Sequence, residues 1–83
     1  FLPDNNITRA EFAAVFSKFI YEVTDKSEVN YNDLDFNDWF YTPVSKMTNC
    51  GYMNGYEDGT FRPNDYITRD EAVTVIDRMI NSK

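Results

Sequence analysis

The sequence predicts an all-α fold with long ordered loops, built from a helical repeat within one small domain. Two stretches of apolar residues recur at intervals of three and four, which is the spacing of one face of a helix. Each stretch follows a Thr-Arg-x-Glu turn, and a threonine followed three residues later by glutamate is the pattern of a capping box. No strand-like alternation of apolar and polar residues extends beyond a few positions. The length of 83 residues allows one compact core and is too short for two.

The chain repeats itself at an offset of 60 residues. Residues 1–11, FLPDNNITRAE, align with residues 61–71, FRPNDYITRDE, and share Phe, Pro, Ile, Thr, Arg and Glu at equivalent positions. Repetition at a fixed period is typical of units that stack on one another and share a core. We therefore expect the second half of one unit at residues 1–23, a polar surface linker at 24–37 and a complete unit at 38–83.

The two equivalent helices are expected to begin at Thr8 and Thr68. In a capping box the threonine side chain accepts a hydrogen bond from the N–H three residues later, and the glutamate at that position accepts one from the threonine N–H. Glu11 and Glu71 occupy the glutamate positions. All four residues are therefore expected to act as structural caps.

A further helix is expected between them, from about residue 38 or 42 to residue 49. Pro43 suits only the first turn of a helix, which leaves the start at either position. Gly51 is placed to end this helix as a left-handed residue. The residues expected on the buried faces are, in chain order, Phe12, Val15, Phe16, Phe19, Ile20, Val23, Trp39, Phe40, Val44, Met47, Ala72, Val75, Ile76, Met79 and Ile80.

Charge and composition exclude several classes of partner. Eight basic residues against fourteen acidic ones give a net charge of −6, so no basic surface is available for nucleic acid. The apolar runs are far shorter than the roughly 20 residues that cross a bilayer, so no membrane span is expected. Cys50 is the sole cysteine and there is no histidine, so neither an intrachain disulfide nor a zinc cluster can form.

Three segments of the second unit carry a family resemblance. They are Asp38-Trp39, the glycine-rich loop GYEDGTFRPN at residues 55–64, and ITRDE at residues 67–71. In this order they resemble the S-layer homology (SLH) domain, with a full motif over about residues 33–83 and the end of a preceding motif over residues 1–20. Three such motifs form a pseudo-threefold spindle of helices in the family, and the resemblance implies that this chain is part of one.

The resemblance also implies a function. Members of the family anchor bacterial surface proteins, typically in Gram-positive species, by binding secondary cell-wall polysaccharide that often carries pyruvate ketals. The implied location is extracellular, at the S-layer or cell wall, and the implied role is not enzymatic. Neighbouring motifs of the parent chain, and other copies of the chain, are further expected partners. Because the sequence opens on Phe1 inside a repeat, we expect an excised piece of a longer protein with its export signal upstream.

The family pattern also suggests site residues. The arginine of the Thr-Arg turn and the glycine loop line grooves between motifs in the family. Carried over residue by residue, polysaccharide binding is expected from Arg9 and Arg69, with Gly55, Asp58 and Gly59 nearby and Trp39 as a groove wall. One departure is Asp70, which replaces the usual alanine and places a carboxylate beside Arg69 that weakens its hold on an anionic ligand.

Each of these features also has a purely structural explanation. A capping box does not require arginine after the threonine, and a guanidinium there could bind a ligand carboxylate or form an internal salt bridge or carbonyl cap. Asp58-Gly59 is a common tight-turn pair. Trp39 could pack in the core rather than on a sugar.

Other functions fit the sequence less well. A protein assembly module without glycan binding stays open, because repeats bury their apolar faces against further repeats. A glycan-cleaving enzyme using Glu57 and Asp58 is disfavoured, because adjacent loop carboxylates lack an acid/base geometry. The Asn54 to Gly59 segment superficially resembles a calcium loop, but Tyr56 stands where an oxygen ligand is needed. We therefore expect no metal and no cofactor.

Overall fold

The computed structural model describes residues 7–20 and 29–81. It contains α1 (Arg9–Ser17), α2 (Tyr41–Asn49) and α3 (Arg69–Ile80), and no strand within these residues. An isolated antiparallel bridge joins Thr8 to Tyr66. The predicted all-α fold with long loops is confirmed.

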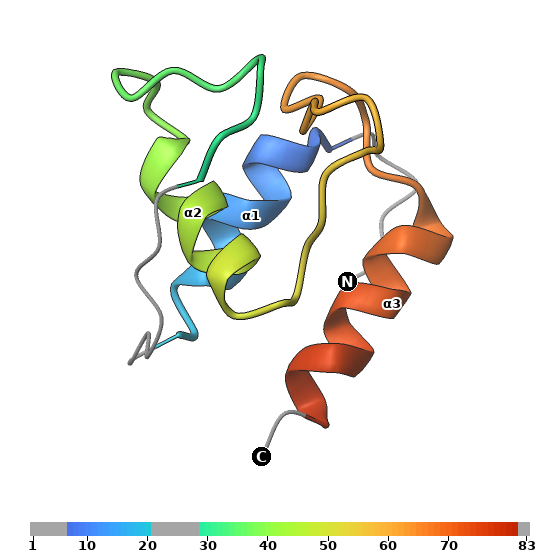
Figure 1. Cartoon of the computed structure of the whole chain (residues 1–83). Helices are drawn as coiled ribbons and strands as arrows, with labels where there is room; N and C mark the ends of the chain where they lie inside the picture. Colours follow the sequence, from blue (N-terminus) through green and yellow to red (C-terminus); the bar gives the residue numbers. More distant parts are fainter. Residues whose placement is uncertain (1–6, 21–28, 82–83) are drawn as a thin grey trace.

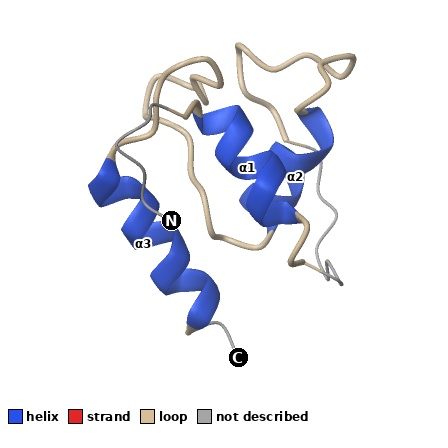
Figure 2. Ribbon diagram, turned by 180° about the vertical axis from the view of Figure 1, so that it is seen from behind, coloured by secondary structure: helices blue, strands red, loops and turns tan. Residues whose placement is uncertain are grey.

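The helices are arranged as a packed pair and a third helix set apart. Helices α1 and α2 pack against each other, whereas α3 lies across a long loop from them (Figure 1). The segment that follows α2 runs between the α1–α2 pair and α3, as the view from behind also shows (Figure 2). This segment, which is part of the second repeat unit, therefore lies between α1 and α3, the equivalent helices of the two units.

The core is formed by all three helices and by the long loop that joins α2 to α3, residues 50–68. Its most buried members are Ala10, Phe12, Ala13, Phe40, Val44, Met47, Met53, Phe61, Ala72 and Val75. The loop contributes Met53 and Phe61, which are 1% and 0% exposed. Burial of side chains this large provides much of the stability of a domain of this size.

Helix ends follow the predicted chemistry with one exception. Thr8 and Glu11 form both hydrogen bonds of a capping box at α1. At α3 the Thr68 side chain accepts from the Glu71 N–H, but the Glu71 carboxylate is directed elsewhere, so this box is only half formed. Gly51, with φ +78°, follows the last turn of α2 as predicted.

Several residues expected on buried faces are exposed instead. Trp39 is 66% exposed because α2 begins at Tyr41, which leaves Trp39 in the turn before the helix rather than on its buried face. On α1 and just beyond it, Val15 and Phe19 are 41% and 62% exposed, and Ile80 on α3 is 66% exposed. Val23 lies outside the described residues.

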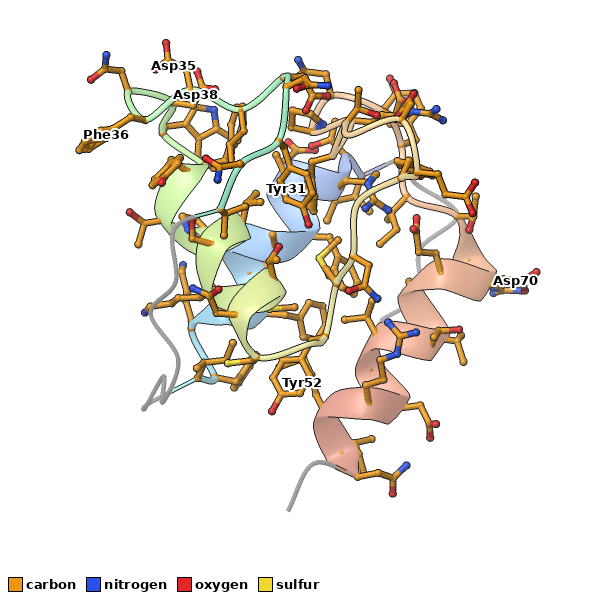
Figure 3. The ribbon with its side chains drawn as sticks, viewed as in Figure 1. Tyr31, Asp35, Phe36, Asp38, Tyr52 and Asp70 are labelled. Atoms are coloured by element: carbon orange, nitrogen blue, oxygen red, sulfur yellow. The ribbon has the colours of Figure 1, made fainter. Side chains whose placement is uncertain are left out.

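Part of the expected surface linker holds the long loop in place. The Asp33 carboxylate accepts hydrogen bonds from the N–H groups of Phe61 and Arg62, each at 2.8 Å. The N–H of Asn32 donates to the Gly59 carbonyl at 2.8 Å. The Tyr31 hydroxyl accepts from the Gly55 N–H at 3.1 Å, and Figure 3 shows Tyr31 pointing toward this loop. These contacts fix the backbone of the loop on the side facing α1 and α2.

Candidate functional site

Arg9 is a buried cation at the junction of the two repeat units. It is the first residue of α1, and its side chain is 1% exposed. Nε donates to the Phe61 carbonyl and Nη2 to the Asn54 carbonyl, both at 2.8 Å. Nη1 donates to the Glu71 carboxylate, which is 31% exposed. All three guanidinium nitrogens therefore have protein partners.

Aromatic rings enclose the same guanidinium. Its central carbon lies 4.6 Å from the centroid of the Phe61 ring and 4.9 Å from that of Tyr56. The electron-rich faces of such rings attract a cation, and the attraction is stronger where water is excluded. The internal salt bridge and carbonyl contacts, one of the two roles left open by the sequence, are the interactions that Arg9 makes in this structure.

Backbone hydrogen bonds align the two units around Arg9. The N–H groups of Arg9 and Ala10 donate to the carbonyls of Asp65 and Pro63, at 2.8 and 3.0 Å. The N–H of Ile67 donates to the Ile7 carbonyl at 2.9 Å. The first-turn N–H groups of α1, which have no partner within the helix, thus bind the loop of the second unit.

Three residues of the glycine loop are expected site residues by resemblance to the family, and each of them also has a structural role. A Cβ on Gly55 would lie 2.3 Å from the Tyr31 ring and 2.7 Å from the Thr60 carbonyl, so no larger residue fits. Gly59 adopts φ +85°, a left-handed conformation that glycine reaches without steric cost. The Asp58 carboxylate accepts from both the N–H and the hydroxyl of Thr60, at 3.1 and 2.6 Å.

Hydrogen bonds from Thr60 and the nearby guanidinium of Arg62 hold the pKa of Asp58 below its ordinary value. Arg62 pairs with Asp58 at 3.2 Å and lies 4.0 Å from the centroid of the Tyr56 ring. The Tyr56 ring therefore contacts two arginines, one of them the buried Arg9. These contacts link the Asp58–Arg62 pair to the ring that packs on Arg9.

The two remaining candidates, Arg69 and Trp39, are exposed. Arg69 is the first residue of α3, and its side chain makes no hydrogen bond or ion pair with the described part of the chain. Trp39 packs edge-on against Phe40 at a centroid distance of 5.3 Å and leaves most of its ring in solvent. The structure thus gathers Arg9 and the glycine loop at the junction, whereas Trp39 packs on Phe40.

A groove of about 470 Å³ lies between the loop and α3. Its lining residues are Met53, Asn54, Gly55, Tyr56, Thr68, Asp70, Glu71, Thr74, Val75 and Arg78. Figure 3 shows Asp70 at the first turn of α3, at the opposite end of the helix from Tyr52. Because Arg78 donates to the Tyr52 carbonyl at 3.2 Å, the groove has a carboxylate toward one end and a cation toward the other.

Two residues that could belong to a site were not predicted from the sequence: Arg78, which lines the groove, and Phe36, which is an exposed aromatic ring. Arg78 lies outside the Thr-Arg turns, and its only sequence signal is a position on the same helix face as Glu71 and Thr74. Phe36 is 73% exposed and contacts Tyr41 at a ring centroid distance of 5.5 Å. Figure 3 shows it at the outer edge of the molecule, in the turn that also holds Asp35 and Asp38.

Two further properties limit the kinds of site that the described residues can form. Residues 7–20 and 29–81 contain no cluster of three or more Cys, Asp or Glu side chains arranged to hold a metal ion. None of the three helices has the length and apolar character required to cross a membrane.

Comparison with known proteins gives one family. The S-layer homology domain matches residues 1–13 and 30–73. Across 96% of its length the chain is 39% identical to Cell surface glycoprotein 1 of Acetivibrio thermocellus, and across 90% it is 38% identical to the Cellulosome-anchoring protein of the same species. Across 88% it is 31% identical to Exoglucanase XynX, also from Acetivibrio thermocellus. The chain spans only 4%, 18% and 7% of these relatives. No solved structure shows a significant match.

Proposed function

The chain belongs to the S-layer homology domain family, and we propose that it helps to anchor a bacterial surface protein non-covalently to the cell wall by binding wall polysaccharide. The observation that carries this proposal is that one small segment is shared by relatives named as a cell-surface glycoprotein, an anchoring protein and an exoglucanase. A segment spanning 7% of an exoglucanase is too small to be its catalytic domain. Attachment is a role that all three relatives could share.

The groove beside α3 is the proposed polysaccharide site. Arg78 can bind a sugar carboxylate, such as a pyruvate ketal, with the two parallel hydrogen bonds that a guanidinium offers. Asp70 can accept hydrogen bonds from sugar hydroxyls at the other end of the groove. The charge of Glu71 is compensated by Arg9, so it does not repel the acidic ligand strongly. The groove can therefore bind an acidic sugar in one orientation.

Trp39 provides a second proposed contact. Exposed aromatic rings bind the apolar faces of sugars, and the Trp39 ring is 66% exposed. Trp39 does not line the groove. A polymer, unlike a single sugar, can contact both places.

The net charge of −6 predicts a characteristic salt dependence. An anionic polymer is repelled by the protein as a whole and attracted only locally by Arg78. At about 0.15 M salt the screening length is about 8 Å, which weakens the long-range repulsion more than a close contact. Binding is therefore expected to persist or strengthen between low and moderate salt.

Calorimetric titration with solubilised, pyruvylated wall polysaccharide tests the proposed site. Arg78→Met removes the cation of the groove and is expected to weaken binding by about tenfold or more, the loss of one charge-assisted contact. Arg69→Met is the matched control, because Arg69 is an exposed arginine on the same helix and does not line the groove. Equal affinity of wild type and Arg78→Met would rule out the groove as the site.

A further inference from the structure

Asn54 is the one asparagine of the sequence that glycine follows, and the pair lies in the long loop between α2 and α3. Asparagine is among the thermolabile residues, because the backbone nitrogen of the next residue can attack its side-chain amide. Glycine has no side chain to hinder that attack, and its backbone is the most adaptable. Asn54 is exposed, and its side-chain amide makes no hydrogen bond with the described residues. The amide carbon is therefore accessible to the Gly55 nitrogen.

The reaction at such a pair needs only water. The Gly55 nitrogen gives its proton to solvent and forms a bond to the side-chain carbon of Asn54. The bond from that carbon to the amide nitrogen breaks, and the nitrogen takes a proton from water and leaves as ammonia. Water then opens the resulting cyclic imide at either carbonyl. Opening at the side-chain carbonyl gives aspartate, and opening at the main-chain carbonyl gives isoaspartate.

Contacts on both sides of the Asn54–Gly55 peptide hold it in place in the folded chain. The Gly55 N–H donates to the Tyr31 hydroxyl at 3.1 Å, so loss of its proton would also lose this hydrogen bond. The Asn54 carbonyl accepts from Nη2 of Arg9 at 2.8 Å, which opposes rotation of the peptide toward the side chain. Attack therefore requires this part of the loop to leave Tyr31 and Arg9 first.

We propose that Asn54 is a site of spontaneous deamidation, which the Tyr31 hydroxyl suppresses while the loop is bound and which proceeds when the junction of the two repeat units opens. A group protected by local structure reacts only from the fraction of molecules in which that structure is open. The two contacts that hold this peptide come from different units, Arg9 from the first and Tyr31 from the segment before α2. Deamidation thus records openings of the junction irreversibly.

Isoaspartate at position 54 would prevent the loop from returning to its place. It lengthens the main chain by a methylene before Gly55 and converts the carbonyl that binds Arg9 into a free carboxylate. The loop has no room for the added carbon, since even a Cβ on Gly55 would lie 2.3 Å from the Tyr31 ring and 2.7 Å from the Thr60 carbonyl. The isoaspartate form, separated by chromatography, is therefore expected to unfold at a lower temperature than the unmodified chain.

Either product also adds a negative charge to the groove beside α3, which Asn54 lines together with Asp70 and Glu71. A further carboxylate there would repel an acidic sugar, a consequence that rests on the proposed function. Asn54→Asp supplies the charge without lengthening the backbone. It is expected to weaken binding of pyruvylated polysaccharide by about two- to fivefold, the effect of one exposed charge pair. Unchanged affinity would contradict this consequence, whereas the deamidation rate is measured without polysaccharide and tests the modification separately.

Peptide mapping by mass spectrometry measures the conversion in the full chain during incubation at mildly alkaline pH. Wild type should convert at least about tenfold more slowly in buffer than in guanidinium chloride, because the folded chain reacts only from its open fraction. Tyr31→Phe should raise the rate of the folded chain by about two- to tenfold, the factor for one hydrogen bond. Thr48→Val is the matched control, because it removes the other partner of the Tyr31 hydroxyl, at 3.3 Å, and leaves Gly55 its acceptor.

The outcomes separate the site from its suppression. Asn54→Gln should abolish the conversion, because glutamine would have to close a larger ring, and conversion that persists in this variant would overturn the site. Equal rates for wild type in buffer and in guanidinium chloride would overturn the protection by the fold, and this comparison needs no variant to fold. A Tyr31→Phe rate equal to that of wild type, or an equal rise in Thr48→Val, would overturn the role of the Tyr31 hydroxyl.

Discussion

Replacing Arg9 by methionine is the most informative change to the fold. Methionine fills much of the volume of the arginine stem but leaves the Phe61 and Asn54 carbonyls without their donors and Glu71 without its cation. Removing one partner of a buried ion pair costs about 3–5 kcal/mol. Because Glu71 is 31% exposed and can be rehydrated, we expect the lower end, about 3 kcal/mol.

That loss is large for a domain of this length. At about 0.05–0.15 kcal/mol per residue, 83 residues give a total stability of about 4–12 kcal/mol. Each kcal/mol shifts the thermal midpoint of such a domain by about 4–8 °C, so the midpoint of Arg9→Met should fall by about 12–24 °C. Urea and thermal unfolding followed by far-UV circular dichroism measure both quantities. Fluorescence is less suitable, because Trp39 is already exposed in the folded state.

Arg69→Met is the control for this experiment, because it makes the same substitution at the equivalent, exposed position. It should change the free energy of unfolding by less than about 0.5 kcal/mol. Arg9→Lys should fall between the two, since lysine keeps the charge but not the planar set of donors. A loss below about 1 kcal/mol for Arg9→Met, or equal losses at both positions, would refute the argument that Arg9 joins the two units.

Two further predictions concern the glycines Gly55 and Gly51 and the carboxylate of Asp58. Gly55→Ala should destabilise by about 2–3 kcal/mol in urea unfolding, through overpacking against Tyr31, whereas Gly51→Ala, strained but in open space, should cost only about 1 kcal/mol. Equal costs would contradict this. The lowered pKa of Asp58 means that its stabilising contribution is complete above the ordinary pKa of 3.8 and is lost as pH falls through the lower folded value. An NMR titration should place the Asp58 midpoint below that of an unfolded reference, and Asp58→Asn should abolish this part of the acid sensitivity.

The helix ends could be predicted from the sequence, because capping depends on a few neighbouring residues. Both threonine caps are local chemistry within four residues, so their positions follow from sequence alone. The left-handed Gly51 at the end of α2 is local in the same sense. The exposed side chains could not be predicted in this way, because Val15 and Val75 differ only in what packs against them.

The candidate site was less predictable for the same physical reason. Arg9 and Arg69 have the same neighbours in sequence, yet one is buried by residues 45 to 62 positions away along the chain. The half-formed cap at Thr68 follows from this, since Glu71 binds the distant Arg9 in place of the local N–H. Arg78 had no motif to mark it, and only the fold shows that it lines the groove.

The most direct test of the anchoring proposal is co-sedimentation of the chain with three preparations of purified cell wall: native, depyruvylated, and stripped of its secondary polysaccharide. Sedimentation with native wall, weaker sedimentation with depyruvylated wall and none with stripped wall is the predicted result. Equal sedimentation with native and stripped wall, or none with any preparation, would contradict the proposal that this domain holds its parent protein to wall polysaccharide.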